Sequence, residues 1–443
     1  MVSCVIKDTN KLLLKGKRRI IIMAQNAISQ KKVQTKTNVQ LQAQKKSSNT
    51  LLAIILFLTI FIAAGFLPSF NPSVADATNH AATALTQDTA TSAWDAIKYE
   101  KSIHIMAMLL LGFGFLMVFV RKHGFSSVTA TFLVVSLSIP LYMLIKSFGG
   151  EGFSMPTVSI DTFIFAEFAA ASLLIAIGAP LGRLKMDQYL IMTMLFIPAY
   201  IFNEWLLLES GLFSGFMDVG GSVIIHAFGA YFGLGVISNT FSKFENGPSS
   251  ENNPMSNQFC LIGSIVLWVF WPSFTSALVA PSEAILTAIN TVFALCGATL
   301  ATYVFTRLLR GKIEIEDIAN AALAGGVAIG TGCNVVSPGF AMIIGILAGA
   351  LSTIGYAVIA PKVEKLIKGT DTCGVHNLHG MPGILGGLTG VLITGNAGMQ
   401  IGGIVVTVAI AFILGKVSGV IIRMFGQKEV PYSDEDEFIM AHE

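Results

Sequence analysis

The segment DVGGSVIIHAFGAYFGL, from Asp218 to Leu234, decides the fold because it places a carboxylate and an imidazole inside a long apolar run. An ionisable side chain in a membrane helix is costly when it faces lipid, so it normally faces the interior of a helix bundle or a polar pathway. We therefore predict a membrane helix here, with Asp218 and His226 turned toward an internal pathway.

A second segment repeats this arrangement. DTCGVHNLHGMPGILGGL, from Asp371 to Leu388, again places an Asp eight residues before a His, with glycines following. In transporters such pairs often mark corresponding helices of two halves of the chain, and the working site lies where the halves meet. We expect His226 and His379 to share one pathway.

The composition is that of a polytopic membrane protein. Of 443 residues, 53% are hydrophobic and 12% are charged, and the mean hydropathy is +0.70. The net charge of +2 and the lack of a basic patch interleaved with aromatic residues give no support to nucleic-acid binding. The five cysteines have no CxxC spacing, so they indicate neither a disulfide framework nor a zinc site. We expect no cofactor.

The chain divides into five parts by composition. Residues 1–50 form a polar arm with eleven of the 28 Lys and Arg residues, which is either cytosolic or removed. The apolar run 51–67 is a first span or a signal sequence, and 68–98 is an extracytoplasmic linker rich in Thr and Ala. The main membrane domain covers 99–424, and an acidic tail follows at 425–443.

The membrane domain contains eleven further apolar segments with short breaks between them. Their approximate limits are 99–120, 128–146, 160–181, 186–208, 218–240, 258–280, 284–306, 318–334, 338–360, 379–394 and 400–424. Loops on one side hold thirteen Lys and Arg residues and loops on the other hold three, so the positive-inside rule places the tail in the cytosol and the Asp218 end outside.

These observations predict an all-α polytopic membrane protein with 11 to 12 transmembrane helices. The two Asp-to-His segments lie five spans apart, and an odd offset inverts the second copy relative to the first. We therefore expect two pseudo-symmetric inverted five-helix halves around a central pore.

The two imidazoles suggest a specific chemistry. Each neutral ring has one donor and one acceptor nitrogen, so two facing rings could share a proton and offer a polar site to a small neutral guest. The alternative is that each His only bonds a backbone carbonyl and ties helices together. Asp218 precedes Gly220, Gly221 and Ser222, so it could cap a helix start, recruit a cation, or do both.

Three other ionisable residues fall in or near spans. His376 and His379 have HxxH spacing, which could bind a metal, but apart from Asp371 no further ligand stands at a suitable spacing, so we expect no metal and place His376 at the inner mouth. Glu204 lies near the outer end of its segment and could draw in cations. Glu167 has no evident partner, and a helix-pairing role is open for either glutamate.

Four ordered motifs, DVGGSVIIHAFGAYFGL, FWPSFTSA, NAALAGGVAIGT and DTCGVHNLHGMPG, resemble the Rhesus (Rh) branch of the ammonium channel superfamily. The segment GFGFLMVFVRKHGFS is similar to an early span of the same family, and the resemblance covers Tyr99 to Arg423. It implies a homotrimer in the plasma membrane, with a separate pore in each subunit and facilitated passage of ammonia.

When the family's residues are matched to this sequence motif by motif, the resemblance implies that His226 and His379 are the twin pore histidines. It also implies that Phe168 and Phe274 are the stacked gate. Asp218 matches the essential carboxylate of the family. Two further positions are less regular. Glu204 matches a vestibule acid, although its fourteen-residue distance to Asp218 is longer than the usual spacing, and Leu278 replaces a serine that the Amt branch uses in its outer ammonium site.

The expected mechanism is that ammonium arrives at an acidic vestibule, loses a proton near the phenylalanines and crosses as NH3, because a bare cation in an apolar tube has no substitute for its hydration shell. Net NH3 passage and electrogenic passage both remain open at this point. The rival functions are a CO2 channel and an ammonium sensor; we expect no enzyme.

Overall fold

The computed structural model describes residues 87–119, 124–147, 158–238, 254–427 and 432–440, together with four single residues between 53 and 61. The chain divides into the units 1–56 and 57–443, and the second is described here. The predicted arm, nearly all of the first apolar run and the linker up to residue 86 lie outside the described residues.

Every regular element in the described ranges is a helix. These elements are α2 (Gln87–Ala107), η2 (Met108–Phe113), α3 (Gly114–Leu116), η3 (Met117–Phe119), α4 (Gly124–Ser147), α5 (Ile160–Gly178), α6 (Met186–Glu204), η4 (Trp205–Glu209), η5 (Ser222–Ala227), α7 (Phe228–Ile237), α8 (Pro254–Thr275), α9 (Ala284–Arg310), α10 (Ile315–Ala321), α11 (Ala324–Ile329), η6 (Gly330–Gly332), α12 (Pro338–Ile354), η7 (Gly355–Ile359), α13 (Ala360–Ile367), η8 (His376–Gly380), α14 (Met381–Thr394), α15 (Ala397–Arg423) and α16 (Asp434–Glu437).

Eight helical stretches in the described part are long and apolar enough to cross a bilayer, and Ser222–Ile237 is a shorter apolar helix. The prediction of an all-helical, multi-pass membrane protein is confirmed, whereas the count of eleven or twelve crossings stays a prediction. The first described helix begins at Gln87, so the end of the expected linker is helical.

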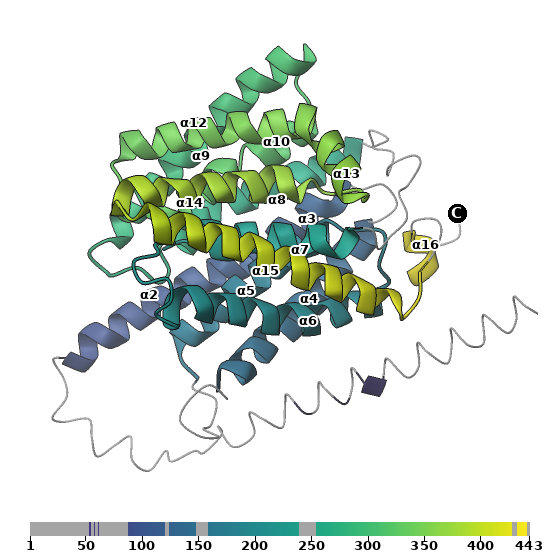
Figure 1. Ribbon diagram of the computed structural model, residues 1–443, viewed down its shortest axis with the longest axis horizontal. Coiled ribbons are helices and arrows are strands. Elements are labelled where there is room, and N and C mark those ends of the chain that lie inside the picture. Colours follow the sequence, from purple (N-terminus) through teal and green to yellow (C-terminus); the bar gives the residue numbers. More distant parts are fainter. Residues whose placement is uncertain are drawn as a thin grey trace, which may run out of the picture. The chain divides into compact units, whose positions relative to one another are not determined.

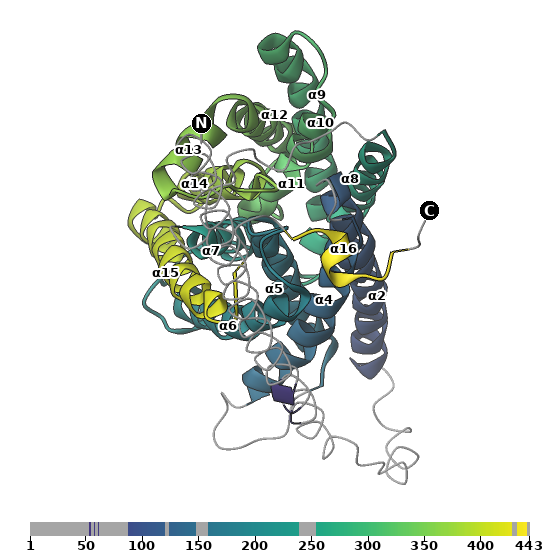
Figure 2. The same ribbon diagram turned by 90° about the vertical axis from the view of Figure 1, so that its right-hand side faces the viewer.

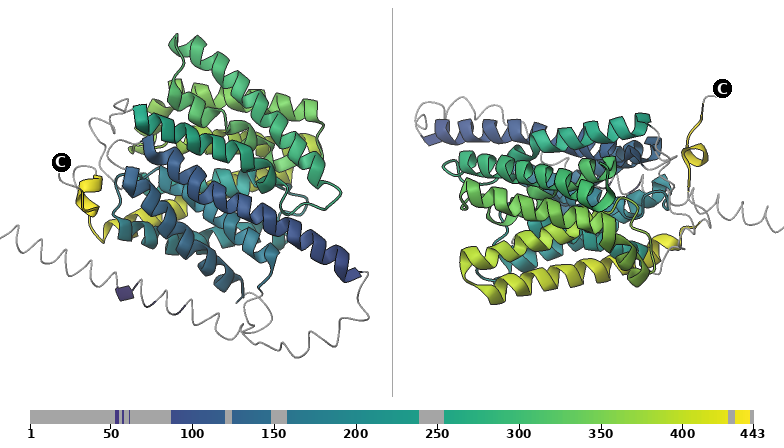
Figure 3. Two further views of the ribbon diagram at one scale, coloured as in Figure 1. Left: turned by 180° about the vertical axis from the view of Figure 1, so that it is seen from behind. Right: turned by 90° about the horizontal axis from the view of Figure 1, so that it is seen from above.

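The long helices run in roughly one direction and pack side by side (Figure 1). Seen from the end of the bundle, α7 lies inside a ring that includes α15, α6, α5 and α14 (Figure 2). On the far side α2 runs along α8 (Figure 3). The interior position of α7 (Phe228–Ile237) explains why this helix is apolar on all its faces: Phe228 and Phe232 are fully buried.

Glycines let several helix pairs approach to backbone contact. A Cβ added to Gly345 of α12 would collide with the carbonyl of Ala294 on α9, and one added to Gly415 of α15 would collide with the carbonyl of Phe232 on α7. Lipid is as apolar as a helix surface, so membrane helices associate through such close packing rather than through a hydrophobic force between them.

The start of the acidic tail is packed against the bundle. The Tyr432 amide donates to the carbonyl of Gly182, and Tyr432 itself is buried. The Asp434 carboxylate accepts from the amides of Phe125 and Ser126 and from the Ser126 hydroxyl, at 2.6–3.0 Å. Asp434 therefore caps the first turn of α4, where free N–H groups and the helix dipole favour a carboxylate.

Replacing Gly345 with Ala should destabilise the protein, because the new methyl group must push the α9 backbone away. Overpacking of this kind costs about 1–3 kcal/mol. Gly339→Ala, on the same helix, is the matched control because no atom lies within 4 Å of its added Cβ. Thermal unfolding in detergent should show a lower midpoint for Gly345→Ala alone; equal midpoints would contradict the packing argument.

Candidate functional site

Asp218 holds the backbone in front of the first histidine helix. One carboxylate oxygen accepts from the amides of Val223 and Ile224, at 2.9 and 2.7 Å, and the other accepts from the Thr331 hydroxyl at 2.8 Å. Gly221 takes a left-handed conformation, with a φ of 78°, in which a residue with a side chain would be strained. The result is a capped turn from which the π-helical turn η5 begins.

Asp371 does the same for the second histidine helix. Its two oxygens accept from the amides of Val375 and His376, each at 3.0 Å. Gly374 has a φ of 65° and stands three residues after the Asp, as Gly221 does after Asp218. The π-helical turn η8 follows, and π-helical turns are frequent at functional sites. Burial raises the pKa of Asp371 to about 6, while bonds from the two amides oppose that rise.

The two histidines meet inside the bundle. The Nδ1 atoms of His226 and His379 lie 3.2 Å apart, and the rings are nearly parallel, with planes 11° apart and centroids 5.3 Å apart. Their exposed fractions are only 3% and 4%. We call these two side chains the histidine pair.

The contact fixes how protons are distributed over the histidine pair. Two nitrogens at this distance form a hydrogen bond only when one of them carries a hydrogen and the other offers its lone pair. In the neutral pair one Nε2 is then an acceptor and the other a donor. The Nε2 of His226 is buried and has no hydrogen-bond partner within the described residues, so it is free to bind a guest.

Small residues bring the two histidine helices together. A Cβ on Gly383 of α14 would lie 3.0 Å from the Ala227 amide nitrogen, and a Cβ on Gly386 would crowd the Ser222 hydroxyl. That hydroxyl donates to the carbonyl of Val327, at 2.7 Å, and accepts from the amide of Thr331, at 2.9 Å. The glycines thus let α14 approach η5, and Ser222 ties η5 to α11 and η6.

Aromatic rings close the path on one side of the histidine pair. The rings of Phe168, on α5, and Phe274, on α8, lie 4.5 Å apart between centroids. Phe274 is 6.2 Å from the His226 ring, and Trp271 stacks on that ring at 5.6 Å. Phe168 and Phe274 therefore lie together on this side of His226.

A cavity of about 350 Å³ lies in front of the phenylalanines, and we call it the vestibule. Its lining includes Phe168, Tyr200, Glu204, Asp218 and Leu278. Asp218 reaches this wall, but its oxygens already accept three hydrogen bonds from protein groups. Glu204 is therefore the better placed of the two carboxylates to attract a cation.

On the opposite side of the histidine pair the space is much smaller. A cavity of about 20 Å³, enough for roughly one water-sized molecule, is lined by residues that include His379, Phe113 and Asn320. The Phe113 ring lies 6.4 Å from the His379 ring and within 25° of its plane. Neighbouring contacts therefore lead from the vestibule past the two phenylalanines and the two histidines to this small cavity.

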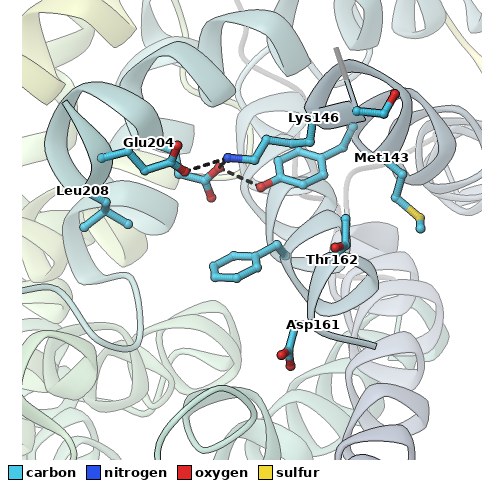
Figure 4. A pocket seen from close by; sticks show the side chains of 10 residues that line it. Met143, Lys146, Asp161, Thr162, Glu204 and Leu208 are labelled. Carbon is cyan, nitrogen blue, oxygen red and sulfur yellow. Dashed lines mark hydrogen bonds and ion pairs between the residues drawn. The ribbon is translucent and has the colours of Figure 1, made fainter. Parts of the chain in front are cut away.

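A third cavity, of about 520 Å³, adjoins the vestibule and shares Phe165, Glu204 and Leu208 with it. We call it the side chamber. Figure 4 shows Lys146 reaching across it toward the Glu204 carboxylate, while Asp161 lies apart from that pair. The Tyr142 hydroxyl donates to Oε2 of Glu204 at 2.6 Å, and the Lys146 amine faces the same oxygen.

The structure brings together six of the residues chosen from sequence: His226, His379, Phe168, Phe274, Asp218 and Glu204 lie along one path. His376 is set apart. Its ring meets Tyr231 edge-on at 5.7 Å, and its amide donates to Asp371. Glu167 is fully buried beside Phe168 and accepts from the Ser102 hydroxyl at 3.0 Å, which supplies the partner that its sequence context did not suggest.

Sequence reasoning missed four residues of the site. Trp271 and Thr331 lie within quoted motifs, FWPSFTSA and NAALAGGVAIGT, so their places in those motifs were the available signal. Lys146 is the last residue of the predicted segment 128–146 and Tyr142 stands four residues before it, and nothing local to them points to Glu204.

The chain is similar in sequence to known proteins of one family. Residues 95–442 match the model of the Ammonium Transporter Family. The chain is 41% identical over 305 residues to Ammonium transporter Rh type B of Xenopus tropicalis, a match that covers 67% of the chain and 65% of that relative. A match to the human Rh type B protein is 41% identical over 312 residues and covers 68% and 66%. The chain thus spans about 65% of the length of these curated relatives.

Two solved structures also superpose on this chain. The structure of Nitrosomonas europaea Rh50, described as a member of the Rhesus protein family of channels, is 49% identical and superposes with a TM-score of 0.76 over 80% of this chain and 94% of that one. A structure named Sensor Amt Protein superposes with a TM-score of 0.67 at 20% identity, covering 78% of this chain and 96% of that one, and so shares the fold.

Asp218→Ala should destabilise the fold strongly, because it leaves the Val223 and Ile224 amides and the Thr331 hydroxyl without their acceptor. Each buried group left unsatisfied costs about 1–3 kcal/mol. Asp218→Asn keeps one acceptor oxygen and should be milder, and Thr331→Val, which removes one bond, should be milder still. Thermal unfolding in detergent gives the order; an Asp218→Ala protein as stable as wild type would refute the capping role.

Proposed function

The chain belongs to the Rh branch of the ammonium transporter family, and from this premise we propose that it is a channel for ammonia and ammonium. The observation that carries the proposal is the buried histidine pair, with a Nδ1 to Nδ1 distance of 3.2 Å, behind a phenylalanine constriction. A pair that offers one donor and one acceptor nitrogen suits NH3, which has both N–H groups and a lone pair.

Recruitment takes place in the vestibule. Glu204 is 3% exposed and lines both the vestibule and the side chamber, so its charge acts in a partly dehydrated space, where attraction for a cation is stronger than in water. Asp218 contributes to this step mainly through structure, because its oxygens are occupied by Val223, Ile224 and Thr331.

At the phenylalanine constriction NH4+ gives its proton either back to water in the vestibule, which yields net NH3 passage, or onward to the histidine pair, which makes transport electrogenic. Phe168 and Phe274 offer no oxygen or nitrogen ligand to replace the hydration shell of NH4+, and transfer of an unpaired cation into an apolar space is very unfavourable. Neutral NH3 pays only the smaller cost of a polar molecule. The same argument excludes K+, which cannot lose its charge.

NH3 then moves along the edge of the histidine pair. The unpartnered Nε2 of His226 offers it a first hydrogen bond, and His379 offers the next before the guest enters the 20 Å³ cavity. A CO2 path would need only the apolar surface, so the two imidazoles favour ammonia over CO2.

The proposal includes the arrangement of the protein in the membrane. We place it in the plasma membrane as a homotrimer with one pore per subunit, and we assign eleven crossings in the described domain, because three stretches that begin at Ser222, Ile315 and His376 add to the eight longer ones. The matched caps at Asp218 and Asp371 support two inverted halves. The excess of Lys and Arg in alternate loops supports a cytosolic tail.

Proteoliposomes given an inward ammonium gradient should become alkaline inside faster than empty liposomes, because entering NH3 takes up a proton. Stopped-flow fluorescence of an enclosed pH dye measures the rate, and a supported membrane measures charge movement. Alkalinisation without current means net NH3 passage, whereas a sustained current means that the proton also crosses. No response above empty liposomes would overturn the proposed function.

His226→Ala and His379→Ala should each slow alkalinisation by at least about fivefold, since loss of one buried hydrogen-bonding step is worth about 1 kcal/mol. Loss of selectivity, measured as K+ or water flux, is the alternative sign of a damaged pair. Gly339→Ala, in an open position on α12, is the control for reconstitution. Unchanged rate and selectivity in both variants would remove the histidine pair from the mechanism.

A further inference from the structure

The side chamber already contains a cation that belongs to the protein. The Lys146 amine lies 2.7 Å from Glu209 Oε1 and 3.6 Å from Glu204 Oε2. Lys146 comes from the last turn of α4, Glu204 from the end of α6 and Glu209 from the end of η4. Its ammonium group therefore sits between two carboxylates at the wall that the side chamber shares with the vestibule (Figure 4).

The two carboxylates differ in how much they depend on this partner. The Glu209 side chain is 51% exposed, so water can replace the lysine there at little cost. The Glu204 side chain is 4% exposed, and among the described residues its Oε2 is contacted by the Tyr142 hydroxyl and the Lys146 amine. A buried carboxylate without a cation is strongly disfavoured, so Glu204 has the greater need of one.

The Lys146 side chain has room to move away from Glu204. Its side chain is 29% exposed and ends a flexible stem, and a chamber of about 520 Å³ lies around it. A lysine ammonium and a free ammonium ion also present the same chemistry to a carboxylate: a compact, strongly hydrated positive charge with several N–H donors. One can replace the other on Glu204 without changing the type of bond.

We propose that Lys146 is a tethered competitor of ammonium, which occupies the cation position on Glu204 until an ammonium ion displaces it. The inference rests on the proposed function and adds a residue that sets the apparent affinity. With Lys146 in place Glu204 stays paired when no substrate is present, and the concentration needed to load the vestibule is raised.

The alternative is a purely structural role, in which Lys146 fastens α4 to α6. That role predicts a less stable protein after substitution and a lower maximal rate, but no tighter binding of substrate. Competition predicts the opposite change in affinity, so the dependence of rate on ammonium concentration separates the two.

The experiment measures initial alkalinisation of proteoliposomes over a range of ammonium concentrations for wild type, Lys146→Met and Lys146→Arg. Lys146→Met should lower the half-saturating concentration about threefold to fivefold, the scale of ion pairs between partly exposed groups, with little change in maximal rate. Lys146→Arg keeps a tethered cation and should behave as wild type. Thermal unfolding of each variant checks that it is folded.

Lys98→Met is the matched control. Lys98 pairs with Asp161, another residue of the side chamber, at 2.6 Å, so its loss removes the same charge from the same mouth without touching Glu204. It should leave the half-saturating concentration unchanged. An equal shift in Lys98→Met would mean that surface potential alone is responsible and would overturn the proposal.

Two other outcomes are decisive. If Lys146→Met and wild type show the same concentration dependence, whether saturating or linear, Lys146 does not compete with ammonium. If wild type shows no flux above empty liposomes, it is the proposed function that fails. A shift restored by arginine and absent in Lys98→Met would establish the competition.

Discussion

The site depends on two buried aspartates that hold backbone amides. Asp218 and Asp371 each accept from two consecutive amides after a glycine in the left-handed conformation, and each is followed by a π-helical turn that carries a histidine. Without the carboxylates these buried N–H groups would have no partner, which a membrane interior does not tolerate. The caps therefore set where both histidine helices begin, and so where His226 and His379 lie.

Close packing then turns two local motifs into one site. Gly383 and Gly386 let α14 approach η5, and Ser222 bonds η5 to the carbonyl of Val327. These contacts bring the two imidazoles close enough for their Nδ1 atoms to share a hydrogen bond at 3.2 Å. The supports of the pair are backbone contacts, which cannot relax as a long side chain can.

The residues on the two sides of the phenylalanine constriction differ in charge. The vestibule and side chamber contain Glu204, Lys146 and Glu209, whose charges are partly hydrated and paired. Beyond Phe168 and Phe274 the described residues around the histidine pair and the 20 Å³ cavity are uncharged: the imidazoles, the Asn320 amide and mostly apolar groups. A species that is charged on the first side must become neutral to use the second, and this contrast underlies the selectivity that we propose.

The sequence by itself determined the all-helical membrane class and the pairing of the two Asp-to-His segments. These depend on hydropathy and on an eight-residue spacing, both of which are local properties of the chain. The sequence left open whether Asp218 caps a helix, recruits a cation or does both; the structure shows the capping bonds from Val223 and Ile224 and adds one from Thr331, which lies 113 residues away. Folding alone likewise decided the ion pair of Lys146 with Glu204 and the hydrogen bonds from Tyr142 to Glu204 and from Ser102 to Glu167. Such contacts depend on how each helix is rotated against its neighbours, and a helix that is apolar on every face carries no periodic signal that fixes its rotation.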